Sequence, residues 1–546
     1  MTGAEICKRF NSLEGNARGN WMNLWQECAD WSLPTNDNIN RIRVEGQEKS
    51  PQRMIDTCIE ANFNFASGFF SHMFPPNTVW AKFRHPNPQM MSKPGVADYF
   101  ERASRVAHQL LIGSNFAQEE FQALLAMGAF GTNTLSMEED DRDIVKFRSF
   151  IVSNLVMDMN HRGEIDVVGR KFKLDARQAI QQFGEEALAK AKLEYFSDPA
   201  IQMKETKYEF IHLVTPRGDY DKSKKDSKNK PWASYYVCEM NKEIVKEGGF
   251  TYNPYKVGRF TVGNDEVYGR GPMSSVLGTA RRTNVIYRSM NISAEQHSNP
   301  QWLVPDDDSV KGISGRAGAL IKWRAQNPNG RPERLAPNGD PNIAHEMYVL
   351  HDTQIKRMFF NHLFRPLEDY RNMTATEVNE RMTTDMMTIA PFVSRYQDEH
   401  VSPIMENLYY IMQKRNMLPP MPAALQEDPS FEIEYVGRLS LATKNFETLG
   451  AVNTLRIFGE LSQMNPQMAQ SMDNVDPDKL FKEIWYAQSS SMNALKPEDE
   501  VEAQREAQAQ AMAQQQQVEN MPKVADSVQK LSGAVDPSSV VAQQSE

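Results

Sequence analysis

The sequence predicts a mixed α+β fold that is rich in helix. Apolar residues recur at helical spacing in several stretches, as in Trp21, Trp25 and Cys28, which would share one face of a helix. Other stretches alternate apolar and charged residues, as in residues 431–435, a pattern typical of a half-buried strand. Two helical patterns also enclose an excursion rich in glycine, proline and asparagine at residues 301–342. A chain of 546 residues has room for three or four domains of these elements.

The first part of the chain is predicted to be helical. Ser50 and Pro51 are a cap and a first-turn proline, and they predict the start of a second helix after the Trp21 pattern. That helix carries a wide apolar face of the kind that packs into a core, and it should end at residues 74–77. Two more helical patterns follow, at residues 96–112 and 116–127.

Strands are predicted next. Residues 128–172 are mostly strand-like, including residues 164–168, and Asp175 is placed to cap a helix that runs to Gly184. The loop at residues 216–231 contains lysines that suggest DNA binding, but aspartates alternate with them, so a solvated loop is the preferred interpretation. Strand patterns return at residues 234–238 and 257–262.

The middle of the chain predicts a stalk. Pro272 stands where a helix should begin, and the apolar pattern continues to about Gln296. A second helical pattern covers residues 343–364. The excursion between them holds strand-like pieces at residues 302–304 and 319–323. Two helices with a compact tip between them can stand antiparallel as a stalk.

A corner and a long helical region follow the stalk. Pro366 disfavours a continuous helix, and Thr374 with Glu377 has the spacing of a capping box for a new one. We expect this new helical region to be interrupted near two prolines, Pro391 and Pro403.

The last hundred residues differ in composition. A helical pattern appears at residues 449–458, whereas residues 498–517 are mainly alanine, glutamine and glutamate. Such a segment is typical of a helix of self-associating copies or of a solvated segment. We expect weak order from residue 521 onward.

Charge and cysteine usage narrow the classes of function. A net charge of −10 argues against a general nucleic-acid coat, and residues 441–546 carry 8 basic and 15 acidic residues. The four cysteines lack metal-ligand spacing, so we expect no zinc site, and this usage fits a reducing cytoplasm. We expect no signal peptide before Trp21, because Glu5, Lys8 and Arg9 interrupt any apolar core. We also expect no membrane span, because no run of about 18 apolar residues occurs.

No group of residues points to catalysis. The phosphate-binding GxxxxGK[ST] loop and the GxSxG nucleophile elbow are both missing from the sequence. Acidic runs at residues 138–143 and 306–308 lack a nearby histidine and are interpreted as solvated turns. His345 and Glu346 begin like a zinc-protease motif, but Val349 stands where the second histidine is needed. We therefore expect a protein that is not an enzyme and holds no metal or cofactor.

Two short motifs and their spacing carry a family resemblance. Residues 268–272 read YGRGP and residues 374–378 read TATEV, with a long helical pattern between them. Residues 163–184 join a basic strand to a glutamine-rich helix, and residues 248–260 lead into the first motif. In this order the segments resemble the portal protein, the head-to-tail connector of short-tailed phages (podoviruses). The resemblance covers roughly residues 21–441 and depends on order and spacing.

The resemblance implies a portal-type subunit with a wing, a two-helix stem, a small β-rich clip, a tunnel loop and a helical crown or barrel. These parts would be 1–271 (first part of the wing), 272–299 (stem helix), 300–342 (clip), 343–363 (stem helix), 364–373 (tunnel loop), 374–440 (long helix and second part of the wing), 441–497 (crown) and 498–546 (Gln/Ala-rich barrel helix or disordered tail).

The resemblance also implies a function. Copies of the chain would form a ring, a dodecamer in this family, at one vertex of the capsid in the virion, after synthesis in the cytoplasm of the bacterial host. Double-stranded DNA would pass through the ring during packaging and ejection. The terminase large subunit and then the tail adaptor protein would dock on it, and the scaffold and major capsid proteins would surround it.

Three groups of residues are candidates for these contacts. Tunnel-loop residues that would touch the DNA backbone weakly are Arg365, Glu368, Asp369, Arg371 and Asn372. Stem residues that must meet water, acids of a neighbouring subunit or DNA phosphate are Arg281, Arg282 and Arg288. Clip residues that would either anchor a docking partner or form the clip's own small core are Trp302, Leu320 and Trp323.

A second class of function stays open. The Gln/Ala-rich tail and the 30 methionines also suit an internal virion or ejection protein of a short-tailed phage. The predicted stalk between Tyr268 and Thr374 distinguishes the two classes, because an ejection protein needs no such stalk.

Overall fold

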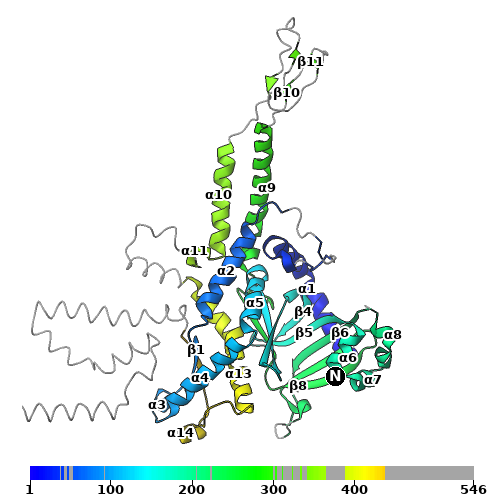
Figure 1. Cartoon of the computed structure of the whole chain (residues 1–546), viewed down its shortest axis with the longest axis vertical. Coiled ribbons are helices and arrows are strands. Elements are labelled where there is room, and N and C mark those ends of the chain that lie inside the picture. Colours follow the sequence, from blue (N-terminus) through cyan, green and yellow to red (C-terminus); the bar gives the residue numbers. More distant parts are fainter. Residues whose placement is uncertain are drawn as a thin grey trace, which may run out of the picture. The chain divides into compact units, whose positions relative to one another are not determined.

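The computed structural model describes most of the chain up to Val436. Within that span it describes all residues except 37, 42–45, 48–52, 92, 205, 222–223, 225, 299–301, 304–309, 312–321, 324–332, 335–340 and 365–387. The chain divides into two units, Met1–Phe446 and Glu447–Glu546. The described residues, drawn as a coloured ribbon in Figure 1, all belong to the first unit. The new helix expected at Thr374, the 449–458 pattern, the crown and the tail lie outside the described residues.

Helices pack around the largest hydrophobic core of the described part. Their apolar faces bury aromatic residues such as Trp25, Phe65 and Phe69. The predicted helices at residues 96–112 and 116–127 are confirmed, the second with three further residues. The main helices of this core are α1 (Gly3–Ser32), α2 (Thr57–Met73), α4 (Val96–Gly113), α5 (Phe116–Phe130) and α13 (Ser402–Lys414).

The expected start of α2 at Ser50 is wrong for the described part of that segment. Residues 53–56 are not helical, and the helix begins at Thr57, with Asp56 in the capping position. Arg53 explains the difference, because its guanidinium donates to the backbone carbonyl of Asp30, 3.1 Å away, and lies 3.4 Å from the Asp56 carboxylate. These contacts hold the approach to α2 against the end of α1.

Two antiparallel sheets carry the strands predicted between residues 128 and 262, together with two strands that the sequence analysis did not predict, Tyr208–Pro216 and Glu243–Phe250. The three-stranded sheet has the order β3-β2-β9, so β9 joins β2 although more than a hundred residues separate them. The five-stranded sheet is a simple meander in chain order. The strands of the first sheet are β2 (Thr132–Asp140), β3 (Ile144–Phe150) and β9 (Tyr255–Arg259). Those of the second are β4 (Leu155–Met159), β5 (Ile165–Leu174), β6 (Tyr208–Pro216), β7 (Trp232–Cys238) and β8 (Glu243–Phe250).

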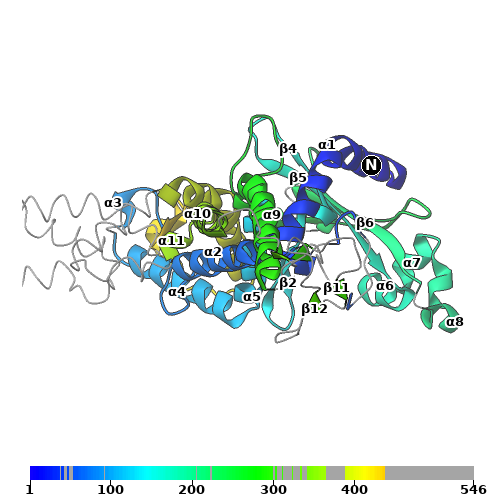
Figure 2. The ribbon, with the colours of Figure 1, turned by 90° about the horizontal axis from the view of Figure 1, so that it is seen from above.

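Helices cover both faces of the five-stranded sheet. Figure 2 shows α1 on one side and the short helices α6 (Ala176–Phe183) and α7 (Glu185–Lys190) on the other. Phe10 of α1 is fully buried in the cluster on its side. The predicted cap of α6 is confirmed, because Asp175 and Gln178 form a reciprocal capping box. A sheet covered on both faces is a rigid support for what is attached to it.

The strand predicted at residues 431–435 is confirmed as β14 (Glu432–Tyr435). It pairs with β1 (Ala81–Arg84) in antiparallel register, with Phe83 opposite Ile433. Arg84 lies 2.6 Å from the Glu432 carboxylate and 3.5 Å from that of Glu434. The end of the described chain is thereby fixed beside α4.

The structure describes the predicted helical region around the two prolines only from residue 388 onward. Residues 388–396, which include Pro391, are helical, and the interruption expected near Pro391 is not tested because the preceding residues lie outside the described part. Before Pro403 the helix widens into a π-helical turn, η7 (Gln397–Val401), and then continues as α13. Pro403 has no N–H to donate to the carbonyl four residues earlier, and a wider turn accommodates this loss without ending the helix.

Candidate functional site

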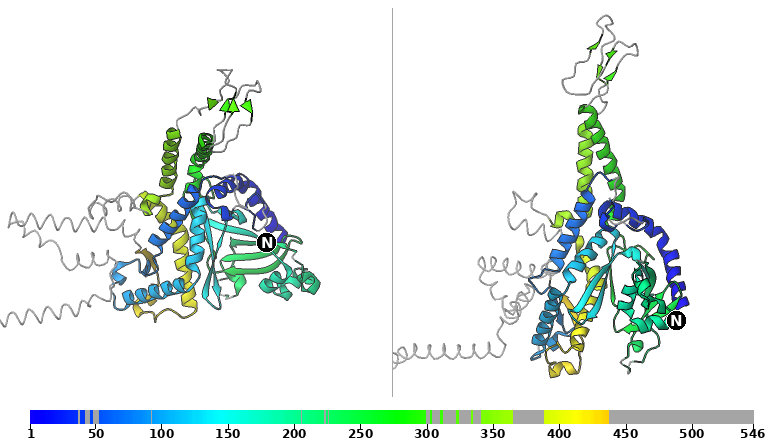
Figure 3. Two further views of the ribbon diagram at one scale, coloured as in Figure 1. Left: turned by 45° about the horizontal axis from the view of Figure 1, so that its top comes forward. Right: turned by 45° about the vertical axis from the view of Figure 1, so that its right-hand side comes forward.

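Two antiparallel helices, α9 (Pro272–Ser298) and α10 (Pro341–Met358), run side by side in both views of Figure 3, and we call this pair the stem. The beginning of α9 is buried in the body, for example at Met273, and so is Ile355 near the end of α10. Further out, the rings of Tyr287 and Tyr348 meet with centroids 5.6 Å apart. The predicted stalk is therefore present, with its base embedded in the largest core.

The second stem helix is shorter than predicted. It ends at Met358, and Phe360 adopts a left-handed φ of +57° before the short helix α11 (Asn361–Phe364) begins. Phe359 is fully buried and Phe360 lies against Phe392, with ring centroids 5.8 Å apart. Packing of both aromatic rings in the core explains the break within the 343–364 pattern.

Short strands lie between the stem helices, as the sequence predicts. Four two-residue strands form two small antiparallel pairs, β10 with β13 and β11 with β12. Trp302 lies on β10 and Trp323 on β12, so the two tryptophans belong to different pairs, whereas Leu320 lies outside the described residues. The strands are β10 (Trp302–Leu303), β11 (Val310–Lys311), β12 (Lys322–Trp323) and β13 (Glu333–Arg334).

The YGRGP turn fixes the base of α9 against the end of α5. Gly131 ends α5 with a left-handed φ of +80°. A Cβ on Gly271 would lie 2.7 Å from both the Gly131 nitrogen and the Met127 carbonyl oxygen, and one on Gly269 would lie 2.3 Å from the Gly131 oxygen. The Gly269 N–H donates to the Thr132 hydroxyl at 2.8 Å. The two glycines of the motif are needed because backbone meets backbone here.

The tyrosine of the same motif lies in the core. The Tyr268 hydroxyl accepts a hydrogen bond from the Met157 backbone N–H at 3.2 Å, and its ring packs edge-on against Trp25. Burial raises the pKa of Tyr268 to about 12, so the phenol is neutral. Arg270 points outward, where it pairs with Glu266 and its guanidinium lies 4.8 Å from the centroid of the Trp21 ring. The motif therefore joins α1, β4 and α9.

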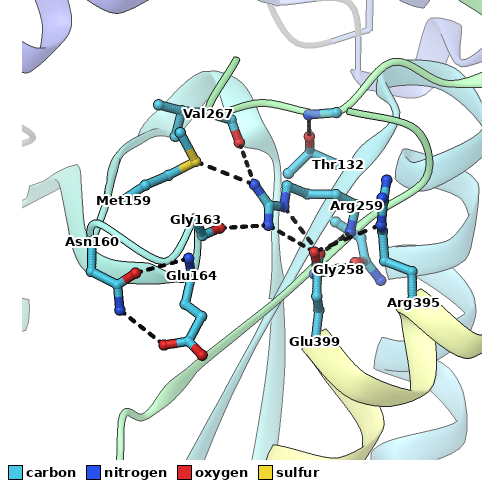
Figure 4. Close-up of polar contacts among 12 residues, drawn as sticks. Thr132, Met159, Asn160, Gly163, Glu164, Gly258, Arg259, Val267, Arg395 and Glu399 are labelled. Carbon is cyan, nitrogen blue, oxygen red and sulfur yellow. Dashed lines mark hydrogen bonds and ion pairs between the residues drawn. The ribbon is translucent and has the colours of Figure 1, made fainter. Parts of the chain in front are cut away.

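Arg259 connects four segments at the base of the stem (Figure 4). Its guanidinium binds both oxygens of Glu399 on the π-helical turn, at 3.0 and 2.7 Å. It also donates to the carbonyl of Gly163 at 3.0 Å and to that of Val267 at 3.4 Å. Glu399 accepts in addition from the Arg259 backbone N–H at 3.1 Å. A bidentate, nearly buried pair of this kind fixes orientation as well as distance.

A second buried polar network stands behind this pair. Glu120 of α5 is fully buried, accepts a hydrogen bond from the Tyr396 hydroxyl and has His400 Nε2 3.0 Å from its other oxygen. Asn133 donates to the Tyr396 hydroxyl and accepts from the Gly258 N–H, both at 3.0 Å. Burial and the charge of Glu120 raise the pKa of Tyr396 far above its usual range. The network ties α5, both sides of the β2–β9 pair and the π-helical turn together.

The predicted stem arginines have different environments. Arg281 forms a two-pronged ion pair with Glu27 of α1 in the same subunit, an option that the sequence interpretation did not include. Arg282 and Arg288 are exposed. Together with Val285, Ile286, Met347 and His351, Arg281 and Arg282 line a groove of about 420 Å³ between the stem helices.

The predicted tunnel-loop residues lie outside the described residues, and of the predicted loop (364–373) the structure describes only Phe364, which ends α11. Arg259, Glu399 and Glu120, which organise the stem base, were missed as functional residues. One signal for them exists in the sequence, since Arg259 belongs to the approach to the YGRGP turn. Its partner Glu399 lies 140 residues further along the chain, and no local pattern connects the two.

The polar contacts at the base of the stem hold structural elements together. Arg259 and Glu399 are paired with each other, Glu120 is held by Tyr396 and His400, and these contacts hold elements together. In the part of the chain that the structure describes, no helix is long and apolar enough to cross a bilayer. A two-helix stem fixed on a mixed α+β body in this way defines a structural subunit.

Comparison with known proteins specifies the family. The chain belongs to the bacteriophage head to tail connecting proteins, whose family model matches residues 4–494. It is 25% identical to the portal protein of Salmonella phage epsilon15 over 510 residues, which cover 92% of this chain and 90% of that protein. It is also 25% identical to the probable portal protein of Bordetella phage BPP-1 over 548 residues, which cover 98% and 96%. These relatives confirm the resemblance to phage portal proteins.

Proposed function

We propose that this chain is the portal subunit of a short-tailed phage and forms a ring at one capsid vertex through which double-stranded DNA is packaged and ejected. The two relatives named above, a portal protein and a probable portal protein, match this chain along 90% and 96% of their own length. The ring would contain twelve copies, as the family resemblance implies. Energy for DNA movement would come from a separate terminase motor, since no catalytic motif was recognised in the sequence.

The observation that carries this proposal is an exposed apolar stripe on each of the two stem helices. On α10, Ile343, Met347 and Leu350 follow one another at spacings of four and three residues, and on α9, Val285 and Ile292 are seven apart. All five side chains are between 45% and 63% exposed. Such spacing is that of helices that pack against other helices. A stem of one subunit packed on the stem of the next would cover both stripes, and a repeated contact of this kind closes into a ring.

Variants of the stripe test the proposed ring. Leu350→Glu and Val285→Glu would each place a carboxylate in the contact, and we expect rings to be lost while the subunit stays folded. Val349→Glu is the matched control, because Val349 is 47% exposed on the same helix but lies off the stripe. Native mass spectrometry gives the assembly state and circular dichroism the fold. Rings of unchanged yield in both stripe variants would remove the stem from the subunit contact.

The remaining parts are assigned by the same proposal. Residues 300–342 would be the clip on which the terminase large subunit and then the tail adaptor dock, and residues 364–373 would be the tunnel loop. Residues 1–271 and 374–440 would form the wing, residues 441–497 the crown and residues 498–546 the barrel helix or tail, with scaffold and major capsid proteins around the ring. Replacing residues 301–341 by a short flexible linker should abolish adaptor binding and leave ring formation intact. Unimpaired adaptor binding would refute the clip assignment.

The tunnel loop has its own test. Arg365 and Arg371 bracket two acidic residues, a mixture that would contact DNA phosphates weakly and without reading sequence. The double variant Arg365→Ala with Arg371→Ala should assemble normal rings and procapsids but package or retain less DNA. Full-length packaging by the double variant would exclude this loop from the mechanism.

The alternative, an internal virion or ejection protein, is less well supported. The stem with a buried base and an exposed apolar stripe has a purpose in a ring, and an ejection protein has no need of it. The family match along residues 4–494 is also to head to tail connecting proteins.

A further inference from the structure

The apolar stripe of α9 lies on the side of that helix turned away from α10. Tyr287 marks the side that faces α10, since its ring meets that of Tyr348. A helix turns by about 100° per residue. Val285, two residues before Tyr287, therefore lies about 160° around the helix from it, and Ile292, five residues after, lies about 140° from it. Both exposed side chains project from the far side of α9.

The stripe of α10 has the same arrangement in reverse. Ile343 precedes Tyr348 by five residues and Leu350 follows it by two, so they lie about 140° and 160° from the side that faces α9. Both are exposed. The stripes of α9 and α10 therefore project from opposite sides of one stem. A contact between copies related by rotation joins two different faces, and this placement provides them.

Each stripe carries one exposed charge at the same position, and the two charges are opposite in sign. Arg288 lies three residues after the first stripe residue of α9 and four before the second, and Glu346 has the same place between the outermost stripe residues of α10. Residues at these spacings share a helix face. The ion pairs of the described stem residues join Arg281 and Lys356 to other carboxylates and include neither of these charges.

We propose that α9 of one subunit packs antiparallel against α10 of the next, with Arg288 paired to Glu346 of the neighbouring copy. The proposal rests on the proposed ring. Rotation about a ring axis keeps all stems pointing the same way, and α9 and α10 run in opposite directions within each stem (Figure 3). The two helices that meet between copies are therefore antiparallel, and the basic flank of one stripe meets the acidic flank of the other.

The spacing of the stripes sets the register of this contact. Both stripes span seven residues, so in an antiparallel contact Val285 meets Leu350 and Ile292 meets Ile343. The two charges then lie one residue away from direct opposition, a separation that long arginine and glutamate side chains can bridge. Apolar pairs with opposite charges beside them are the pattern by which packed helices select partner and orientation.

Charge reversal in rings of the full-length protein tests the pairing. Arg288→Glu and Glu346→Arg each place like charges side by side at every contact of the ring, so the rate at which rings lose subunits should rise at least about tenfold. The double variant restores the pair with its signs exchanged, and its rate should return close to that of the unmodified protein. Circular dichroism of the dissociated subunits should be unchanged, because both side chains are exposed.

Arg282→Glu is the matched control. Arg282 is exposed on the same helix, six residues before Arg288, and it lines the groove between the stem helices. In the proposed register it lies opposite Thr353 and out of reach of Glu346. Combining Arg282→Glu with Glu346→Arg should therefore leave the rings as unstable as Glu346→Arg alone.

Cysteine pairs test the register independently. Val285→Cys with Leu350→Cys should form a disulfide under mild oxidation. The two cysteines of one subunit project from opposite sides of its stem, so the bond joins two subunits and gives a ladder of multimers on a denaturing gel. Val285→Cys with Ile343→Cys is the control and should remain monomeric on the gel. The four native cysteines are buried and take no part.

The contrary results are distinct. Single reversals without effect, a double reversal that does not restore the rings, or cross-linking of the 285–343 pair in place of the 285–350 pair would overturn this contact and leave the ring proposal standing. Absence of rings in the unmodified protein would overturn both.

Discussion

At the scale of single residues, the stem base depends on charged side chains that are buried and paired. Arg259 reaches Glu399, Gly163 and Val267 at once, so one guanidinium joins β9, the β4–β5 hairpin, the approach to α9 and the π-helical turn. Breaking a buried pair leaves the other charge without a partner, which costs far more than losing an exposed pair. The position of the stem on the body should therefore be sensitive to this one side chain.

We predict that Arg259→Ala lowers the free energy of unfolding by about 3–5 kcal/mol. Arg259→Lys should also be destabilising, because an ammonium cannot reproduce the bidentate contact with Glu399. The control is Arg102→Ala, which removes an exposed pair with Asp98 within α4 and should change stability by less than about 1 kcal/mol. Urea unfolding followed by tryptophan fluorescence measures all three. Equal effects of Arg259→Ala and Arg102→Ala would contradict the role given to Arg259.

Lys256 gives a prediction about pH. Its pKa is near 10.5 in the unfolded chain and about 7 in the folded subunit, so folding releases a proton between these pH values. Between pH 7 and 10.5 the unfolded state binds more protons than the folded state, so the free energy of unfolding rises with pH over this range. Lys256 lines a cavity of about 860 Å³. The other charged groups that line the same cavity are Glu406, Asp398, Glu399, Arg259, Arg162, Glu164 and Asp166.

Relative to Lys256→Met, the unmodified subunit should gain up to about 1.4 kcal/mol per pH unit between pH 7 and 10. The measurement is denaturant unfolding of both proteins at several pH values under conditions that keep the subunits dissociated. Parallel stability curves for the two proteins would show that Lys256 is not held with a lowered pKa.

At the scale of elements, the turn before α9 requires glycine for steric reasons. Gly271 approaches the backbone of Gly131 and Met127 so closely that a methyl group has no room. We predict that Gly271→Ala lowers the free energy of unfolding by about 1–3 kcal/mol. The added methyl group would force the end of α5 and the start of α9 apart. Gly278→Ala is the matched control: Gly278 lies within α9, an added Cβ there would have nothing within 4 Å, and the change should stabilise by roughly 0.5–1 kcal/mol.

Thermal unfolding of the two glycine variants gives the comparison directly. A lower midpoint for Gly271→Ala with an unchanged or higher one for Gly278→Ala is expected. The same small shift in both would mean that the turn does not constrain the stem.

The elements that the sequence predicts well are those with local signals. The Asp175 cap, the start of α9 at Pro272 and the alternation in β14 are all readable within a few residues, and all are confirmed. The misplaced boundaries depend on distant contacts. The start of α2 is set by Arg53 against the end of α1, and α10 ends early because Phe360 packs on Phe392.

The same distinction applies to the candidate site. Arg281 is recognisable as a charged residue on an otherwise apolar helix, but its partner Glu27 lies 254 residues away and carries no mark in the sequence. The pairing of β1 with β14 and the contacts of Glu120 with Tyr396 and His400 are equally remote. Contacts between such distant residues arise when the whole unit packs. Local patterns such as helical periodicity and capping motifs do not reveal them.

At the scale of the whole molecule, the described unit combines a rigid body with a stem whose outer surface lacks a partner. The body has its strands covered and Arg259 and Glu120 tied to their partners, whereas the stem exposes an apolar stripe at helix-packing spacing. A single subunit leaves this stripe in water, whereas the proposed ring of copies would cover it. We propose that the protein acts as a closed ring and not as a free subunit.

Negative-stain electron microscopy of the purified full-length protein, with native mass measured on the same sample, tests whether the protein forms the proposed ring. We predict closed rings with a central channel and a mass that is a whole multiple of the 62.3 kDa subunit. A protein that remains a stable monomer at micromolar concentration, with no ring even when scaffold protein is added, would contradict the proposed ring.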